Sequence, residues 1–456
     1  MRKHWKKLAL LLAVTAIAAS PLLALSRGKS EPASSDVITL PNGNKYRFSG
    51  TTYGTNHVHG PLGARLAHTL PDPAEDFLKK ELGNHLGQLQ SFASVEPSLC
   101  IWFDPVMTGA SATNAPRCGF FAMLADQTGA LGGSRASGSA WPNQPFGLIF
   151  RLVPRRASTL ELAFFQELPE NRLGSQLGRV RVPNPLYGRF PQWQPDSSIP
   201  AVKAAGDVEV HLNKFALGIE GHQPAQPGDE IPTTYEVSFK SLGQANGAWE
   251  ISRAEMSDAT GNHLYESYQL LRGGDQRFWG MLWPDEHAWS LKLAVKHRLP
   301  NLSGSSSRKF VPEDYGIHPE ELLTFTNVPL LAATATNDLW FTNAAGGTRI
   351  VMREYMPEPN GKGSGFSTFD RPKFHADCAD GSDGVSVEFL EATSAQGEKL
   401  ETISKVMMMI GQPAPRAGDY LFTALRSPAT NVANVNVTWV AQKTRPVEFL
   451  LKPPQH

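Results

Sequence analysis

The feature of this sequence that most constrains its fold is a tight turn that recurs between extended apolar runs. Asp126 and Gly129 frame the first copy, residues 258–261 form the second, and residues 394–397 form a third that begins with Ser394 instead of an aspartate. An Asp or Ser side chain accepts hydrogen bonds from nearby backbone N–H groups, and glycine tolerates positive φ. The copies lie 132 and 136 residues apart. This spacing indicates duplicated domains rather than a short-period solenoid.

Each turn is followed by the same order of strand, charged break and second strand. We expect each strand pair to form a hairpin that closes its unit, with the break as a solvated turn. The 40 glycines and 35 prolines among 456 residues agree with a turn-rich β fold. The expected strand pairs are 146–153 with 159–165, 278–283 with 289–295, and 435–440 with 447–451.

The sequence therefore predicts an all-β protein of tandem sandwich-like, immunoglobulin-like units. One amphipathic helix is expected at residues 73–90, because Asp72, Pro73 and Glu75 form a helix start and leucines recur after them at helical spacing. The expected organisation is a signal peptide or single-span membrane anchor (1–25), a polar tether (26–36), a first β unit (37–170), a Pro-rich linker (171–206), a second unit (207–298), a Ser-rich linker (299–319) and a third unit (320–453).

The N-terminus predicts export across the cytoplasmic membrane. Four basic residues lie within the first seven positions, and an apolar run follows at residues 8–25. The basic flank of such a segment stays cytoplasmic and the rest of the chain is translocated. Ala16 and Ala18 form a small-x-small site that predicts a cleaved signal peptide. Uncleaved, the run would be about 27 Å long as a transmembrane helix, which is enough to anchor the protein in the membrane. Both outcomes stay open.

Charge and cysteine content limit the classes of partner and of covalent cross-link. The chain has 43 basic and 43 acidic residues, so we expect no global field that would attract nucleic acid. Three cysteines cannot form a disulfide framework. A Cys100–Cys118 bridge and buried free thiols are both compatible with the sequence, and Cys378 stands apart from that pair.

Several short phrases carry a resemblance to known sequences. They are residues 39–43 (Thr-Leu-Pro-Asn-Gly), 53–57 (Tyr-Gly-Thr-Asn-His), 183–185 (Pro-Asn-Pro) with Trp193 and Pro195, and 258–262 (Asp-Ala-Thr-Gly-Asn). In these phrases the chain resembles a group of exported, multi-domain β-rich bacterial proteins of unknown function. The resemblance covers most of the exported part and implies export and a multi-domain β architecture. Its motifs are short and turn-like, and no catalytic residue is carried over from it.

One acidic cluster suggests hydrolytic chemistry. Asp285 and Glu286 lie between Trp283 and Trp289, and aromatic side chains beside acids suit glycosidic cleavage. Adjacent residues in an extended segment point to opposite sides, so a working pair would need a distant partner. The alternative is a charged turn between strands whose tryptophans belong to the core. Basic residues at the same place in the other copies favour a solvated turn.

Two groups of side chains suggest metal binding. His57 and His59 would lie on one face of a strand, with His68 as the nearest third ligand. An acidic, glycine-containing loop is loosely suited to calcium, although it lacks the spacing of an EF-hand. The alternatives are ordinary hydrogen-bonded histidines and plain turns, so we expect no resident cofactor. The three carboxylates of the loop are Asp377, Asp380 and Asp383.

The sequence lacks the common catalytic signatures, namely a His-Glu-x-x-His helix, a Gly-x-Ser-x-Gly elbow and the Gly-rich phosphate and dinucleotide loops. We therefore expect a non-catalytic binding or scaffold protein at the cell envelope, with an envelope protein or a glycan as partner. The apolar N-terminal segment would contact the membrane if it is not cleaved. The alternatives are a secreted polysaccharide hydrolase that uses Glu286 or Asp285, and a calcium-stabilised adhesive protein.

Overall fold

The computed structural model shows an all-β protein. Apart from one 3-10 turn at Pro319–Glu321, each regular element that it describes is a β-strand. The predicted helix at residues 73–90 and the N-terminal segment 1–36 lie outside the described residues. No described helix is long and apolar enough to span a membrane. The structure describes residues 37–60, 90–106, 118–125, 131–140, 144–169, 172–218, 231–242, 249–265, 276–278, 280–299, 317–330, 339–345, 348–355, 373–379, 384–400, 402–406, 421–425 and 433–454.

The first unit consists of two antiparallel four-stranded sheets that share one core. The order of the first sheet is β1-β2-β3-β6, and that of the second is β5-β4-β7-β8. Alternating residues of both sheets, such as Phe103 and Phe164, meet edge to face in the core. The strands are β1 (Val37–Thr39), β2 (Lys45–His59), β3 (Gln90–Pro105), β4 (Cys118–Ala125), β5 (Leu131–Ala140), β6 (Phe146–Phe150), β7 (Thr159–Leu168) and β8 (Arg172–Pro183).

The second unit repeats this arrangement. One sheet has the order β9-β10-β11-β14 and the other β13-β12-β15-β25. A second core cluster lies between them. Its strands are β9 (Ala201–Ala205), β10 (Val208–Leu217), β11 (Thr233–Ser241), β12 (Trp249–Asp258), β13 (His263–Tyr265), β14 (Gln276–Phe278), β15 (Trp289–His297) and β25 (Arg445–Leu451).

The third unit has the same plan with one added strand. Its sheets run β17-β18-β19-β23-β22 and β21-β20-β24-β16, around a third core cluster. The strands are β16 (Leu322–Pro329), β17 (Leu339–Ala345), β18 (Thr348–Tyr355), β19 (Lys373–Cys378), β20 (Val385–Ser394), β21 (Lys399–Leu400), β22 (Thr402–Val406), β23 (Leu421–Leu425) and β24 (Asn434–Lys443).

The recurring turns predicted from the sequence separate equivalent hairpin strands. The pairs β4 with β5, β12 with β13, and β20 with β21 are each antiparallel neighbours. In the second turn Asp258 accepts a hydrogen bond from the backbone N–H of Thr260 at 2.8 Å, and Gly261 has φ 89°. In the third turn Ser394 Oγ accepts from two backbone N–H groups at 3.2 Å, and Gly397 has φ 84°. A serine therefore replaces the aspartate in the same structural role.

The expected hairpins across the charged breaks were wrong. The strands on either side of each break belong to different sheets: β6 and β7, β14 and β15, and β24 and β25. In the first two units both strands are apolar because they cover the same core from opposite sides, whereas β24 packs in the third core and β25 in the second. The break therefore crosses from one layer to another, and it lies where one unit meets the next.

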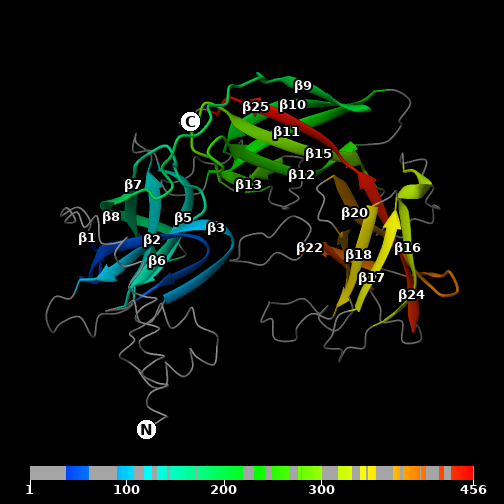
Figure 1. Ribbon diagram of the computed structural model, residues 1–456, viewed down its shortest axis with the longest axis horizontal. Coiled ribbons are helices and arrows are strands. Elements are labelled where there is room, and N and C mark those ends of the chain that lie inside the picture. The colour runs from blue at the N-terminus through cyan, green and yellow to red at the C-terminus, as the bar shows by residue number, and fades with distance from the viewer. Residues whose placement is uncertain are drawn as a thin grey trace, which may run out of the picture.

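The last strand of each repeat shows where the units differ. In the first unit β8 pairs with β7, the strand just before it. In the other two units the equivalent strands are exchanged. β16 follows β15 in the chain but pairs with β24, and β25 follows β24 but pairs with β15. Figure 1 shows β25, in red, beside the green strand β15. The second unit is therefore completed by the end of the chain.

The expected domain boundaries change for this reason. Residues 171–206, expected as a linker, contain β8 and β9, which belong to the first and second units. Residues 445–451, expected in the third unit, pair with the second. The connection between β8 and β9 is held at its start, where Asn184 donates to the carbonyls of Pro154 and Ala157 at 3.0 and 2.7 Å.

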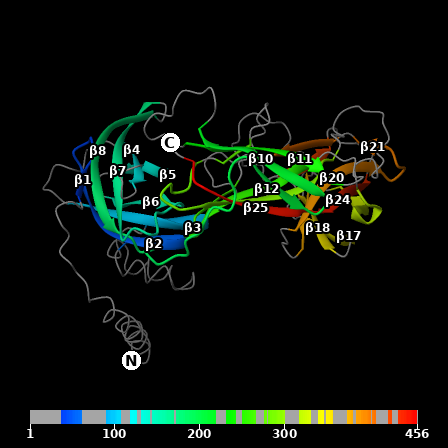
Figure 2. The same cartoon turned by 90° about the horizontal axis from the view of Figure 1, so that it is seen from above.

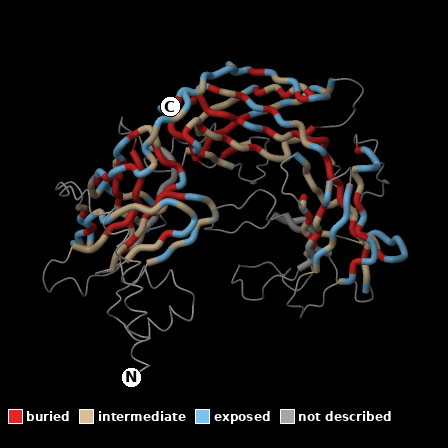
Figure 3. Tube along the Cα trace, in the orientation of Figure 1, coloured by how far each residue is buried: buried red, intermediate tan, exposed pale blue. Residues whose placement is uncertain are grey.

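The three units lie one after another in an arch, with the second unit between the first and the third (Figures 1 and 2). Buried positions concentrate inside each unit and continue where the second unit meets the first and the third (Figure 3). The two junctions are called here the first joint (units one and two) and the second joint (units two and three), and the first joint collects side chains of the charged breaks and of the Asp258 turn.

Candidate functional site

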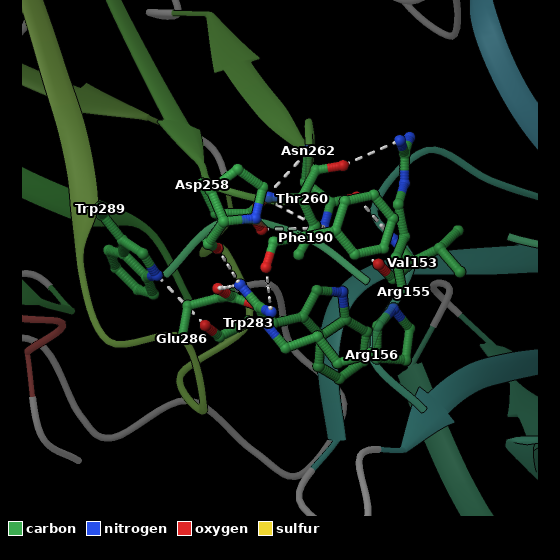
Figure 4. Close-up of polar contacts among 12 residues, drawn as sticks. Val153, Arg155, Arg156, Phe190, Asp258, Thr260, Asn262, Trp283, Glu286 and Trp289 are labelled. Carbon is green, nitrogen blue, oxygen red and sulfur yellow. Dashed lines mark hydrogen bonds and ion pairs between the residues drawn. The ribbon is translucent and has the colours of Figure 1, made fainter. Parts of the chain in front are cut away.

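At the first joint, a side-chain amide from the turn of the second unit binds the backbone beside the break of the first unit, much as a neighbouring strand would. Asn262 accepts from the Val153 N–H at 3.0 Å and donates to the Val153 carbonyl at 2.9 Å. Asp258 fixes this asparagine by accepting from its amide at 2.8 Å, and both side chains are buried. Arg155 donates to the Thr260 carbonyl at 3.0 Å (Figure 4). Through these hydrogen bonds the Asp258 turn holds the second unit against the first.

A buried ion pair crosses the same joint. Arg156 Nε and Nη2 contact the two carboxylate oxygens of Glu286 at 2.7 and 3.0 Å. The side chain of Glu286 is 5% exposed and that of Arg156 is 25% exposed. Arg156 also donates to the carbonyls of Phe190 and Pro191 at 3.2 and 2.6 Å. The expectation that these breaks are solvated turns was wrong, because the basic break of one unit binds the acidic break of the next.

Burial dominates the electrostatics of this pair. Desolvation raises the pKa of the Glu286 carboxyl, and the Arg156 guanidinium offsets this only in part. Glu286 in turn raises the pKa of Arg156 through their hydrogen bonds. A desolvated pair of this kind contributes little net stability, but removal of one partner leaves a buried charge uncompensated. The contact therefore fixes the position of one unit on the other.

Apolar side chains are exchanged across the first joint. Trp283, from the chain of the second unit, is 1% exposed and belongs to the core cluster of the first. Leu152, from the first unit, belongs to the core cluster of the second. The indole nitrogen of Trp289 donates to the Trp283 carbonyl at 3.1 Å, which holds the backbone of Trp283 on the second unit. Both tryptophans are core residues. This is what we expected if the acidic cluster is a turn between strands and not a hydrolytic site.

A histidine and a carboxylate also meet at the first joint. His263 Nε2 lies 3.5 Å from a carboxylate oxygen of Glu96. The hydrogen bond with Glu96 raises the pKa of His263, and the same bond lowers the pKa of Glu96. The pair favours protonated histidine and charged carboxylate, so it stabilises the joint most at mildly acidic pH.

The second joint has a different set of charged contacts around Arg445. Arg445 Nε binds Asp207 at 2.9 Å, and its guanidinium lies 5.1 Å above the Trp249 ring. His297 packs on the same indole with ring centroids 3.9 Å apart. Burial lowers the pKa of His297, and the charge of Arg445 lowers it further. Arg445, at which the third break enters β25, is therefore held by side chains of the second unit instead of facing solvent.

A buried lysine completes the second joint. Lys296 in β15 is 2% exposed. Its ammonium group pairs with Glu250 of the second unit at 3.1 Å and with Glu388 of the third unit. The lysine thus bridges one carboxylate from each unit. In this region the chain passes from β24 of the third unit to β25 of the second with only Thr444 between the two strands.

The acids expected to catalyse hydrolysis lie on opposite sides of their turn. Asp285 is exposed and Glu286 is buried. Arg156 binds both oxygens of Glu286, and the Glu286 side chain is 5% exposed. This placement favours a structural role for Glu286.

The histidines expected as metal ligands are taken up by other contacts. His57 is fully buried and bonds to Thr52 and Ser98, each at 2.9 Å. His59 bonds to Asp104 at 2.7 Å and stacks on Trp102 with ring centroids 4.8 Å apart. Their third candidate ligand, at position 68, lies outside the described residues.

The calcium candidates are only partly described. Asp377 is exposed and accepts a hydrogen bond from the Cys378 N–H at 2.8 Å, whereas Asp380 and Asp383 lie outside the described residues. Among the residues that the structure describes, no cluster of three His, Cys, Asp or Glu side chains is arranged to hold a metal ion. Cys100 and Cys118 are both free thiols, and burial raises the pKa of Cys100 to about 12.

Sequence reasoning missed the residues that build the joints. Arg156, Asn262 and Arg445 belong to motifs that were noticed, but each motif was considered alone. The available signal was the alternation of charge between equivalent breaks, basic in the first unit and acidic in the second. Opposite charges at equivalent positions of two tandem units allow the two breaks to form an ion pair with each other, as Arg156 and Glu286 do.

Comparisons with known proteins identify no family. No protein family and no curated protein matches the chain in sequence. Among solved structures, the chain has a likeness to invasin, a bacterial integrin-binding protein, with 9% identity and a TM-score of 0.13. The alignment covers 88% of this chain and 60% of the invasin chain, so the chain spans less than two thirds of the length of that protein. At this TM-score the likeness carries no argument about fold or function.

Proposed function

We propose that this protein is a non-catalytic binding or scaffold protein of the cell envelope, built to hold three β units in a fixed arrangement. The observation that carries the proposal is the use of the crossover breaks. The breaks of the first and second units bind each other across the first joint through Arg156 with Glu286, and the third break runs from the third unit into the second, where Arg445 binds Asp207. Enzymes commonly place catalytic groups on loops carried by a rigid scaffold. Here the breaks that the sequence singled out are used to join the units.

We further propose that the units are of the immunoglobulin-like class. In the first two units the third strand pairs with the second and sixth, and the fourth pairs with the fifth and seventh; the third unit has the same order when its added strand β22 is set aside. With the second, third and sixth strands as A, B and E, and the fourth, fifth, seventh and eighth as C, C′, F and G, the order is that of a Greek-key β-sandwich. Sandwiches of this class are common in binding modules of cell surfaces.

The basic and apolar N-terminal pattern supports a position outside the cytoplasm. The exported part would be either tethered to the membrane or released after cleavage, and its partner would be an envelope protein or a glycan. The mass of the mature protein distinguishes the two fates, because cleavage after Ala18 removes 18 residues.

The function is tested by incubating the purified exported protein with a panel of envelope polysaccharides and with immobilised glycans. We expect retention of a defined glycan or envelope protein without release of reducing ends. Glu286→Gln is expected to lower the melting temperature, whereas Asp285→Asn, at an exposed neighbour, serves as the matched control with a smaller effect. Release of reducing ends that Glu286→Gln abolishes without a change in melting temperature would support the hydrolase instead.

A further inference from the structure

The break of the first unit carries two adjacent arginines that make different contacts. Arg156 is neutralised by Glu286, which contacts it through both carboxylate oxygens. Arg155 has no carboxylate partner within the described part of the chain. Its guanidinium donates to the Thr260 carbonyl at 3.0 Å and to the Tyr53 hydroxyl at 3.3 Å. Of the two charges in this break, only that of Arg156 is thus balanced by a described acid.

The Asp258 turn holds the guanidinium of Arg155 in place (Figure 4). The carboxylate of Asp258 is itself buried and accepts hydrogen bonds from Thr260 and Asn262. A Cβ atom added at Gly261 would lie 3.3 Å from Nη1 of Arg155, so the arginine rests closely on the glycine of the turn. A guanidinium has five N–H donors, and its two hydrogen bonds leave donors on Nη1 and Nη2 for an anion. Because the side chain is already ordered, an anion that binds it loses little affinity to ordering.

Two exposed tyrosines lie close to this arginine. Tyr53 in β2 is 46% exposed, and its ring centroid lies 5.8 Å from the guanidinium carbon of Arg155. Tyr187, in the connection between β8 and β9, is 58% exposed. The next residue, Gly188, donates its N–H to the Arg155 carbonyl at 3.2 Å, which holds this part of the connection beside the break. Tyrosine and arginine are the side chains that often dominate the binding energy of an interface.

We infer that Tyr53, Arg155 and Tyr187, called here the Arg155 surface, bind an acidic glycan whose sugar rings carry carboxylate groups. A carboxylate would accept from the remaining N–H donors of Arg155, and the apolar face of a sugar ring would pack on an exposed tyrosine. A protein partner normally covers about 800 Å² on each side, whereas one acidic sugar needs only a cation beside an aromatic ring. The inference rests on the proposed binding function and specifies the chemical class of its partner.

Calorimetric titration of the purified protein with oligomers of galacturonate and of glucuronate tests the inference. The same oligomers, with each carboxylate reduced to a hydroxymethyl group, serve as neutral probes of equal size. We expect at least one acidic oligomer to bind, and its reduced form to bind at least roughly 10-fold more weakly, because the contact with Arg155 is charged. Added salt should weaken binding of the acidic oligomer, since the tyrosines and the arginine are open to solvent.

Two variants locate the contact. Arg155→Met should weaken binding at least roughly 10-fold, and Tyr187→Ala roughly 3- to 10-fold. The matched control is Arg298→Met in the second unit, an arginine that is 60% exposed and already pairs with Glu250 at 3.2 Å, and it should leave the affinity unchanged. Arg155 also holds the first joint through Thr260, so the melting temperature of each variant is measured. Tyr187→Ala, at an exposed side chain, tests the surface without altering that joint.

Three results would overturn the inference: no binding of any acidic oligomer, equal affinity for an acidic oligomer and its reduced form, or unchanged affinity in both Arg155→Met and Tyr187→Ala. If the protein then retains a neutral glycan or an envelope protein, the proposed binding function stands and only the acidic glycan is wrong. Release of reducing ends from an oligomer would instead contradict the proposed non-catalytic function.

Discussion

The two joints of this protein connect the same kind of unit by different physical means. The first joint uses side chains: Trp283 enters the core of the neighbouring unit, and Glu286 binds Arg156. Each of its two units keeps its own full set of paired strands except for β25, which comes from the far end of the chain. The second joint uses the backbone, because β16 and β25 each complete the sheet of the other unit. The first joint can thus be loosened by one substitution, whereas units two and three must fold together.

Removal of the last strand is expected to have the largest effect. A chain that ends at Thr444 loses Val447, Phe449 and Leu451 from the core of the second unit. At about 1.5–3 kcal/mol for each buried side chain, the loss is about 5–9 kcal/mol, comparable with the whole stability of a domain. Limited proteolysis should degrade units two and three and leave the first unit intact.

A chain that ends at Pro454 serves as the control for this truncation and should resist protease like the wild type. A synthetic peptide of residues 444–454, added during refolding, should restore protection. Normal stability of the chain that ends at Thr444 would contradict the exchange of strands.

The second largest effect is expected from substitution of Trp283, whose indole crosses the first joint. Trp283→Ala should cost about 3–5 kcal/mol, and the loss should appear in the unfolding transition of the first unit, because the indole lies in that core. Differential scanning calorimetry measures the transitions. If only the transition of the second unit moved, the assignment of this side chain to the first core would be wrong.

The ion pair of the first joint should give an asymmetric response. Arg156→Met leaves the buried Glu286 carboxylate unpaired and should cost about 3–5 kcal/mol. Glu286→Gln leaves a guanidinium that is partly exposed and should cost about 1–3 kcal/mol. Chemical denaturation measures both. The exposed pair of Arg179 with Glu161 is the matched control, and Arg179→Ala should cost about 0–1 kcal/mol. Equal costs for the two joint variants would argue against the burial described for Glu286.

Much of the architecture follows from sequence, and the joints show where such reasoning ends. The turn at Asp258 was predictable, because its geometry depends on the residues within it. The destination of β25 was not, because an apolar alternating strand fits either core equally well. Arg156 and Glu286 were assigned to solvent, since a charged residue in a turn is normally exposed unless a neighbouring domain covers it. Only the relative placement of the units decides this, and no local pattern encodes it.

The two joints should respond to pH in opposite directions. The pKa of His263 at the first joint is raised above its ordinary value of 6.5, so its contribution is full below that value and is lost as pH rises through the folded pKa. The pKa of His297 at the second joint is lowered, so folding is opposed as pH falls below 6.5, when the unfolded chain binds the proton more readily. Asp207 and Arg445 face His297, and Glu96 faces His263.

Stability measured from about pH 5 to about pH 8 separates the two histidines. His263→Gln should remove a component that declines with rising pH, and His297→Gln should remove one that increases. The Glu96 carboxyl, with a lowered pKa, adds stability that is lost only as pH falls through its folded value below 4.5. Parallel changes in the two variants would contradict the assigned environments.

The smallest expected effect is that of a chelator. Neither joint uses a described metal cluster, so we predict an unchanged melting temperature on addition of a calcium chelator. A fall in melting temperature that added calcium reverses would support the calcium-stabilised adhesive protein. It would direct attention to the loop that contains Asp380 and Asp383.

The exchange of strands is tested most directly by a cross-link between β15 and β25. Lys292 lies opposite Glu448 in that pairing, and both side chains are about half exposed. In the variant Lys292→Cys with Glu448→Cys, oxidation should link the two positions within one chain, which peptide mass spectrometry detects. The absence of this link in a folded protein, with a link instead between position 448 and a cysteine placed on β24, would show that the third unit keeps its own last strand.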